Sequence, residues 1–273
     1  MNSQQAILSE FRMSAFVALH GLRRYLRDHS CVNAEEAARS LRRSDSDFAA
    51  VNFEVALRLH SQFPEDIDFV DPATSLRRGL GFLIEKHQPW WSRFFPYGRQ
   101  RLATALTQDE LQTFRSAGLF DEMPSPEIVQ WWDRFANLIR ALEDERLGAQ
   151  GRYAEGLTIN YERKRLASLG ITDEPRWTAL DDNSAGYDVQ SFEQTAFGLK
   201  NQLIEVKSSK RRPPRMILTR GEWDVALQYG DSYVFHLWTL PYEELLVMGV
   251  ANIKAHIPQD NGSGRWTEVE ISF

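Results

Sequence analysis

The chain has 273 residues, of which 42% are hydrophobic and 26% are charged, and its formal net charge is −6. No apolar run is long enough to cross a bilayer, and the N-terminal stretch lacks a basic start followed by a continuous apolar segment, so we expect a cytoplasmic protein with no membrane partner. A single cysteine, Cys31, excludes an internal disulfide framework and a cysteine-based zinc site.

The first half of the chain, residues 1–147, is expected to form an all-helical domain for partner or target recognition. Its apolar spacing and capping residues predict six helices. They lie at 7–22, from Asn33, at about 47–62, from Asp71-Pro72 to before Pro89, from Thr107 with Glu110 in a capping box, and at 125–147.

Five aromatic residues gather in the segment 90–97, four of them between Pro89 and Pro96 and the fifth, Tyr97, directly after. With Arg93, Arg99 and Arg101 nearby, they could stack single-stranded nucleic acid. Aromatic residues at helix ends are more often part of a core or of packing between domains, and we favour that interpretation.

The best candidate for a linker is Gly148-Ala-Gln-Gly151, which would begin a second domain over residues 148–273. Its elements are expected in the order αβββαβ that a three-layer nuclease core requires, within an α+β or α/β fold class. They are a helix at 152–169, strands at 176–180 and in a hairpin at 186–208, a helix at 220–229, a strand at 232–239, and final strands near 245–253 and 266–272.

The hairpin carries three charged residues of interest: Asp188, Glu205 and Lys207. Side chains alternate across a strand, so Glu205 and Lys207 share one face while their apolar neighbours point to the other. With a turn centred near 197–198, Asp188 would lie roughly opposite Lys207 and diagonal to Glu205.

Two carboxylates and an ammonium group on one patch suit metal-assisted phosphodiester hydrolysis. Mg²⁺, or Mn²⁺ in its place, prefers carboxylate oxygens and keeps several waters, so Asp188 and Glu205 would hold the ion. Lys207 would orient the attacking water and screen the charge that develops on the phosphate. The alternative is a solvated strand face with an ordinary Glu–Lys pair.

The helix at 152–169 offers a further acid on its partly apolar side, either Glu155 or Glu162. Glu162 has Arg165 one turn further on and can pair with it. Glu155 has no cation there, so we favour it as an additional metal ligand. The alternative for Glu155 is an acid near the helix start that stabilises the dipole.

Immediately after the hairpin, Lys210, Arg211, Arg212 and Arg215 surround two prolines in an extended loop. Beside the expected metal site, these cations would hold DNA phosphates. An acidic chain can bind nucleic acid through such a local basic patch. The alternative is a solubilising loop.

A series of motifs follows one order through residues 151–240: Gly151-x-x-Ala-Glu, Tyr161-Glu with Leu166 and Gly170, Trp177, Gly186-Tyr-Asp-Val, Ile204-Glu-Val-Lys-Ser-Ser, Leu218-Thr-Arg-Gly-Glu-Trp and Tyr233. In this order they resemble the NO VEIN C-terminal domain family, which is grouped with the PD-(D/E)XK nuclease superfamily.

The resemblance implies a restriction-endonuclease-like core, with Asp188 and Glu205 as metal ligands and Lys207 as the basic residue. Tyr187 stands where the superfamily's name has proline, which is normal in this branch. Many bacterial members are similar to components of restriction and anti-phage defence systems. We therefore expect a Mg²⁺-dependent DNA endonuclease, for which a homodimer would make double-strand cleavage straightforward.

Two other functions stay open. The chain could be a DNA-binding adaptor or sensor that keeps the nuclease fold, although the intact acidic and basic residues argue against a loss of cutting. It could also act only with a protein partner in a defence complex, such as an ATPase or helicase. No P-loop of the G-x-x-x-x-G-K-[ST] type is present, so any nucleotide-driven step would come from that partner.

Overall fold

The computed structural model describes residues 7–49, 51, 53–64, 71–182 and 184–273. The chain divides into two compact units, Met1–Glu143 (unit 1) and Asp144–Phe273 (unit 2). Helix α8 (Pro126–Ser168) continues through the expected linker at 148–151, so the prediction of a linker there was wrong. A glycine weakens a helix by only about 1 kcal/mol relative to alanine, and good helix formers surround these two glycines.

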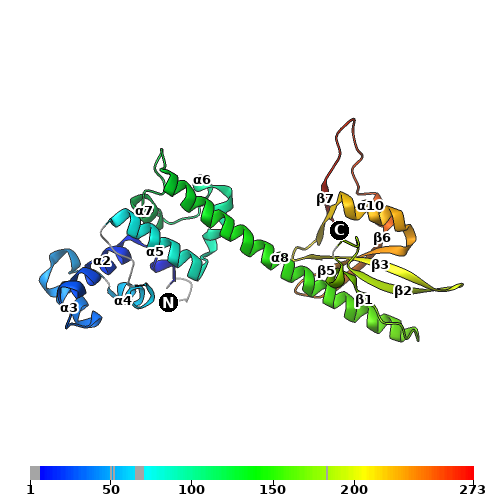
Figure 1. Cartoon of the computed structure of the whole chain (residues 1–273), viewed down its shortest axis with the longest axis horizontal. Helices are drawn as coiled ribbons and strands as arrows, with labels where there is room; N and C mark the ends of the chain where they lie inside the picture. Colours follow the sequence, from blue (N-terminus) through cyan, green and yellow to red (C-terminus); the bar gives the residue numbers. More distant parts are fainter. Residues whose placement is uncertain (1–6, 50, 52, 65–70, 183) are drawn as a thin grey trace. The chain divides into compact units, whose positions relative to one another are not determined.

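Within its described part, unit 1 consists of helices and their connections (Figure 1). They are α2 (Met13–Asp28), α3 (Ala34–Ser44), η1 (Ser46–Phe48), α4 (Phe53–Gln62), α5 (Pro72–His87), η2 (Trp90–Tyr97), α6 (Arg99–Ala103), α7 (Gln108–Ser116) and the first part of α8. The predicted capping box at the start of α7 is confirmed, because the side chains of Thr107 and Glu110 each accept a hydrogen bond from the other's backbone.

The aromatic segment of η2 divides into a buried and an exposed set. Trp91 and Phe95 are buried in the core of unit 1, as the packing interpretation predicts. Trp90 is 43% exposed, and the guanidinium group of Arg93 lies over its ring. Stacking of nucleic acid on the exposed set stays a prediction.

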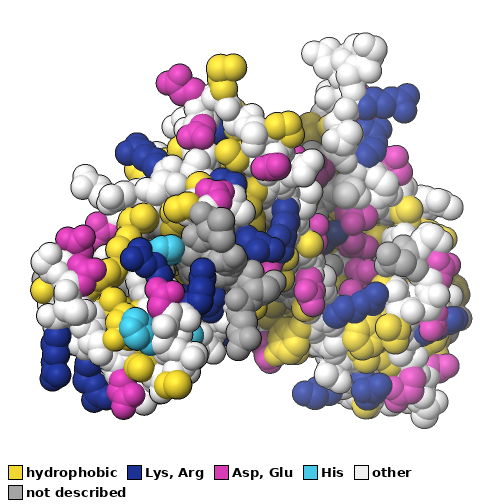
Figure 2. Space-filling model, turned by 60° about the vertical axis from the view of Figure 1, so that its left-hand side comes forward, with side chains coloured by type: hydrophobic (Ala, Val, Ile, Leu, Met, Phe, Trp, Pro, Cys, Tyr) yellow, Lys and Arg dark blue, Asp and Glu magenta, His cyan; other side chains and the backbone are white. Residues whose placement is uncertain are grey.

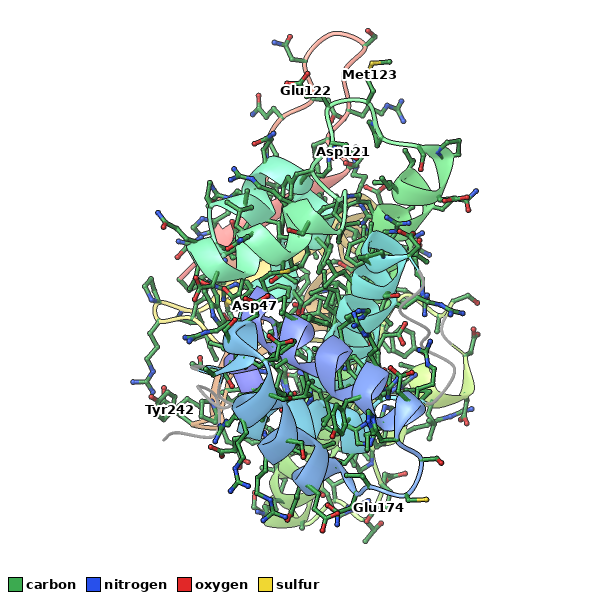
Figure 3. All side chains as sticks on the ribbon, turned by 90° about the vertical axis from the view of Figure 1, so that its left-hand side faces the viewer. Asp47, Asp121, Glu122, Met123, Glu174 and Tyr242 are labelled. Atoms are coloured by element: carbon green, nitrogen blue, oxygen red, sulfur yellow. The ribbon has the colours of Figure 1, made fainter. Side chains whose placement is uncertain are left out.

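The connection between α7 and α8 carries Asp121, Glu122 and Met123 (Figure 3). Arg99 Nη1 donates a hydrogen bond of 2.8 Å to the carbonyl oxygen of Asp121. This arginine, which was a candidate for nucleic-acid binding, therefore also ties η2 and α6 to the connection before α8.

Unit 2 combines helices with two sheets. After the remainder of α8 it contains β1 (Arg176–Trp177), α9 (Thr178–Asp181), β2 (Val189–Thr195), β3 (Gly198–Ser209), β4 (Arg215–Thr219), α10 (Arg220–Tyr229), η3 (Gly230–Ser232), β5 (Tyr233–Thr239), β6 (Glu244–Gly249), α11 (Val250–Lys254) and β7 (Glu268–Ser272). One sheet has the order β1-β2-β3-β5-β6, with β3 and β5 parallel, and the other pairs β4 with β7.

Three elements of unit 2 differ from the expectation. The strand predicted at 176–180 has two residues and passes into α9, and the segment 245–253 divides into β6 and α11. Strand β4 was not predicted. Its residues alternate between exposed and buried over five positions only, directly after two prolines, which is too short a pattern to recognise.

The central sheet is covered on both faces (Figure 1). On one face Ile159 of α8 packs against Val189 and Ile204. On the other, Trp223 of α10 joins a core that includes Phe235 and the buried residues of β4 and β7. Full burial of each large apolar side chain contributes about 1.5–3 kcal/mol, so both layers are held firmly on the sheet.

Across the described ranges, every helix is too short or too polar to cross a membrane.

Candidate active site

The register of the hairpin differs from the expected one by two residues. Thr195 pairs with Gly198, so the turn lies one residue earlier than predicted. Asp188, directly before β2, is bonded to the two residues that flank Glu205. Its backbone N–H donates to the Ile204 carbonyl oxygen at 2.9 Å, and its Oδ2 accepts from the Val206 N–H at 2.7 Å. Asp188, Glu205 and Lys207 therefore lie close together, and the negative charge of Asp188 contributes to the raised pKa of Glu205.

Lys207 is held between two carboxylates. Its Nζ lies 2.8 Å from Glu205 Oε1 and 2.7 Å from Glu222 Oε1. Burial acts to lower the pKa of Lys207, but the two carboxylates outweigh burial and raise it above its ordinary value. The ammonium group is therefore charged at neutral pH.

Glu222 is a site residue that the sequence analysis did not include. It occupies the third position of α10, where Thr219 donates its backbone N–H to Glu222 Oε2 at 2.9 Å. Burial acts to raise the pKa of Glu222, but the charge and hydrogen bond of Lys207 hold it below its ordinary value. The Thr-x-x-Glu capping pattern in the sequence predicts this helix start, although not the contact with Lys207.

The partly buried Asp188 and the buried Glu205 are carboxylates whose ionisation is disfavoured. Burial is the main cause that raises the pKa of Glu205 to about 8. Burial likewise raises the pKa of Asp188 to about 6, against the effect of a 2.7 Å hydrogen bond from the Val206 backbone N–H to Oδ2. A positive charge placed between these two groups would offset the penalty.

Tyr233 connects Glu205 to the chain before β2. Its hydroxyl oxygen lies 2.8 Å from the Gly186 carbonyl oxygen and 3.2 Å from Glu205 Oε2. A phenol has a single proton to share between these acceptors, so a proton on Glu205 allows both contacts to be hydrogen bonds. This geometry agrees with the raised pKa of Glu205.

Glu155 faces this cluster from α8. Its negative charge contributes to the raised pKa of Asp188, and its carboxylate accepts a hydrogen bond from the Trp177 indole N–H. The expectation that no local cation answers Glu155 was wrong, because Arg152 Nη1 lies 2.8 Å from its Oε2. This cation lies one turn before Glu155 on the helix, whereas the prediction rested on the turn that follows it.

Glu162 belongs to a different group of buried residues. It accepts hydrogen bonds from Arg165, as expected, with 2.9 Å between Arg165 Nε and Oε2, and from the hydroxyl of Ser191. His236 Nε2 lies 3.9 Å from Glu162 Oε1, and burial lowers the pKa of this histidine to about 4. Of the two acids considered for the site, the structure thus places Glu155 beside Asp188 and gives Glu162 a pairing role.

The carboxylates fit a hydrated divalent ion. Among the described residues, no three His, Cys, Asp or Glu side chains are arranged as they stand to hold a metal ion. Mg²⁺ needs only one or two carboxylates, because it keeps several of its waters. Asp188 and Glu205 meet that requirement, and the charge of Glu155 acts on Asp188 from α8.

A cleft of about 460 Å³ reaches Lys207 from the surface of unit 2. Helix α8 forms one side of it, and the end of β3 and the following loop form another. Of the four predicted nucleic-acid-binding cations, three line the cleft: Lys210, Arg211 and Arg215. The last two also pair with Glu270, at 3.6 and 3.4 Å.

The fourth predicted cation, Arg212, is absent from the lining of this cleft. Its Nη2 lies 2.7 Å from Glu244 Oε1, and its guanidinium group lies over the ring of Tyr242, the exposed residue labelled in Figure 3. On the face in Figure 2, Lys and Arg side chains are interspersed with Asp and Glu.

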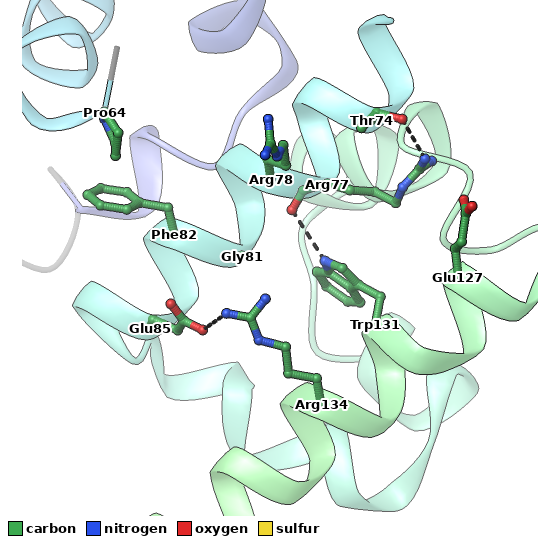
Figure 4. Close-up of a pocket in the computed structure, with 10 residues that line it drawn as sticks. All are labelled: Pro64, Thr74, Arg77, Arg78, Gly81, Phe82, Glu85, Glu127, Trp131 and Arg134. Atoms are coloured by element: carbon green, nitrogen blue, oxygen red, sulfur yellow. Dashed lines mark hydrogen bonds and ion pairs between the residues drawn. The ribbon is translucent and has the colours of Figure 1, made fainter. Parts of the chain in front are cut away.

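A second hollow, of about 600 Å³, lies in unit 1 between α5 and the first part of α8 (Figure 4). Three arginines line it, but Arg134 pairs with Glu85. Arg77 donates to the Thr74 hydroxyl at 2.7 Å and to a backbone carbonyl. The polar groups around this hollow are largely occupied with structural contacts.

Unit 2 is thus an α/β domain with a buried acid–lysine cluster at the end of its hairpin and a basic cleft beside it. Residues 154–245 match the family described as Protein NO VEIN, C-terminal. Neither a curated protein nor a solved structure matches the chain.

Proposed function

We propose that unit 2 is a restriction-endonuclease-like domain of the PD-(D/E)XK type and that the protein is a metal-dependent nuclease acting on DNA, as part of a bacterial defence system. The observation that carries the proposal is the meeting of Asp188, Glu205 and Lys207 at the end of the hairpin, next to a cation-lined cleft. Each group has a place in phosphodiester hydrolysis.

Asp188 and Glu205 would hold Mg²⁺ or Mn²⁺, which when bound supplies an activated water and charge stabilisation for the phosphate. Lys207 presents a permanent positive charge next to both acids, suited to orienting a water and to stabilising negative charge. Glu222 keeps that ammonium group in place through its 2.7 Å contact. Lys210, Arg211 and Arg215 would hold the phosphates on either side of the reacting one.

The test is cleavage of plasmid and phage DNA, modified and unmodified, with Mg²⁺, Mn²⁺ or EDTA. Asp188→Asn is the informative variant, since it removes one charge and keeps the side-chain size. Asp181→Asn is its matched control, because Asp181 is an exposed acid of the same unit that pairs with Arg176. We expect metal-dependent cutting that Asp188→Asn abolishes and Asp181→Asn preserves. Cutting that survives in Asp188→Asn, or in EDTA, would refute the proposed site.

A second candidate is a DNA-binding adaptor that acts only with a partner ATPase or helicase. The contacts of Lys207 and Tyr233 with the two oxygens of Glu205 favour it, because these groups satisfy the acid without an ion. Wild-type protein that binds DNA but leaves every substrate intact with each metal would support this candidate, and a copurifying ATPase would identify the partner.

A further inference from the structure

Two glycines, Gly148 and Gly151, lie inside α8 at positions where packing does not require glycine. A Cβ atom built at either position meets no other atom within 4 Å. Glycine weakens a helix relative to alanine, so glycine at these two positions lowers the stability of α8, and no close packing contact requires it. The two differ in one respect: Gly151 lines the cleft that reaches Lys207, and Gly148 does not.

The cleft around Gly151 is rich in positive charge. The charged side chains that line it are five cations and one carboxylate, namely Arg146, Lys207, Lys210, Arg211, Arg215 and Glu270. Next to Gly151, the Gln150 Nε2 donates a hydrogen bond of 2.9 Å to the Ser208 hydroxyl oxygen, which fixes this turn of α8 against the end of β3. The wall at Gly151 is therefore in a fixed place and lacks a side chain.

We propose that the sugar–phosphate backbone of bound nucleic acid passes directly over Gly151 on its way to Lys207. The inference rests on the proposed action of this site on nucleic acid and adds the path of the substrate. A glycine lets a ligand approach the helix backbone closely, while the cations of the facing loop neutralise successive phosphates. A side chain at residue 151 would project into the space that the backbone occupies.

The experiment compares Gly151→Leu with its matched control Gly148→Leu, and repeats both as alanine variants. Binding of fluorescein-labelled duplex and single-stranded DNA is measured by anisotropy in EDTA, so that no cleavage interferes. We expect Gly151→Leu to weaken binding by about tenfold or more, Gly151→Ala to weaken it less, and both Gly148 variants to bind within about twofold of wild type.

Thermal unfolding of the same samples separates binding from folding. Leucine and alanine are better helix formers than glycine, so all four variants should unfold at the wild-type temperature or above it. A loss of binding in Gly151→Leu is then a steric effect in the cleft.

The outcomes that overturn the inference are distinct from those that overturn the proposed function. If wild-type protein binds DNA and both leucine variants bind it equally well, the path over Gly151 is wrong and the proposed function stands. If wild-type protein binds neither duplex nor single strand, the proposed function fails. If polyglutamate displaces DNA at equal charge concentration, the cleft is a site for acidic polypeptide and the inference is also wrong.

Discussion

Replacement of Lys207 by methionine should destabilise unit 2 strongly, whatever its effect on catalysis. The ammonium group lies 2.8 Å from Glu205 and 2.7 Å from Glu222, and the side chains of the lysine and of these two acids are 17%, 7% and 25% exposed. Methionine keeps most of the length of the side chain and removes the charge, so the buried Glu205 and the partly buried Glu222 lose their shared cation. Removing one partner from a buried ion pair typically costs about 3–5 kcal/mol.

The expected loss depends on pH in a definite direction. In the variant both acids have raised folded-state pKa values, so the folded state binds more protons than the unfolded state above the ordinary glutamate pKa. The free energy of unfolding then falls as pH rises. Lys207→Met should be close to wild type near pH 4 and should lose most stability at and above pH 7.

Hydrogen exchange with mass spectrometry can measure this effect in unit 2 alone. At about 1.4 kcal/mol per tenfold, amides of β3 and β5 should lose roughly a hundredfold to several-thousandfold of their protection at pH 7. Peptides of α2 in unit 1 serve as an internal reference, and Lys200→Met removes an exposed lysine of the same hairpin as a control.

The reasoning is refuted if Lys207→Met keeps protection within tenfold of wild type at neutral pH. If it holds, the double variant Glu222→Gln/Lys207→Met should recover part of the loss, because it removes the ionised carboxylate that Lys207→Met leaves without its cation. Either way, a Lys207 variant alone cannot separate chemistry from folding, which is why Asp188→Asn is the better test of activity.

Two further predictions concern buried polar groups. Burial lowers the pKa of His236 to about 4, so the folded state stays neutral at pH values where the unfolded state gains a proton, that is, below about pH 6.5. The free energy of unfolding is therefore highest above pH 6.5, and about 2 kcal/mol of it should be lost between pH 7 and about pH 5. His236→Gln should remove this pH dependence from the hydrogen exchange of β5. Glu110 accepts a 3.1 Å hydrogen bond from the Trp91 indole and caps α7. Glu110→Ala should therefore destabilise unit 1 by about 2–3 kcal/mol, measured by the same hydrogen exchange. As a control, Glu127→Ala at an exposed position should change the stability by less than about 0.5 kcal/mol.

The sequence correctly predicted which side chains share one face of a strand and where a helix begins. Alternation in β3 correctly separates Glu205 and Lys207 from Ile204, which packs against α8. The capping box at Thr107 correctly begins α7. These features depend on residues a few positions apart, whose relation is set by the period of the strand or by the first turn of the helix.

Features that depend on a count of residues or on distant contacts were harder to predict. A shift of one residue in the turn changes the pairing of the two strands by two positions, so Asp188 is bonded to the neighbours of Glu205 and does not lie opposite Lys207. Glu222 reaches Lys207 from another element, which no local pattern indicates. Gly148 and Gly151 indicated a linker because glycine often interrupts a helix. Whether a helix continues through a glycine depends on the residues around it, which a short pattern does not reveal.

The charge state of the cluster follows from the same contacts. With a pKa of about 8, Glu205 holds its proton at pH 7, while Asp188, with a pKa of about 6, is mostly ionised. Glu222 then balances Lys207, and of the pair Asp188 and Glu205 it is Asp188 that carries the negative charge. A divalent cation that takes Glu205 as a ligand must expel that proton, since a carboxylate binds a metal ion in its ionised form. At the proposed metal site the buried acid would therefore couple binding of the ion to pH, and the affinity for the ion should rise with pH until Glu205 is fully ionised.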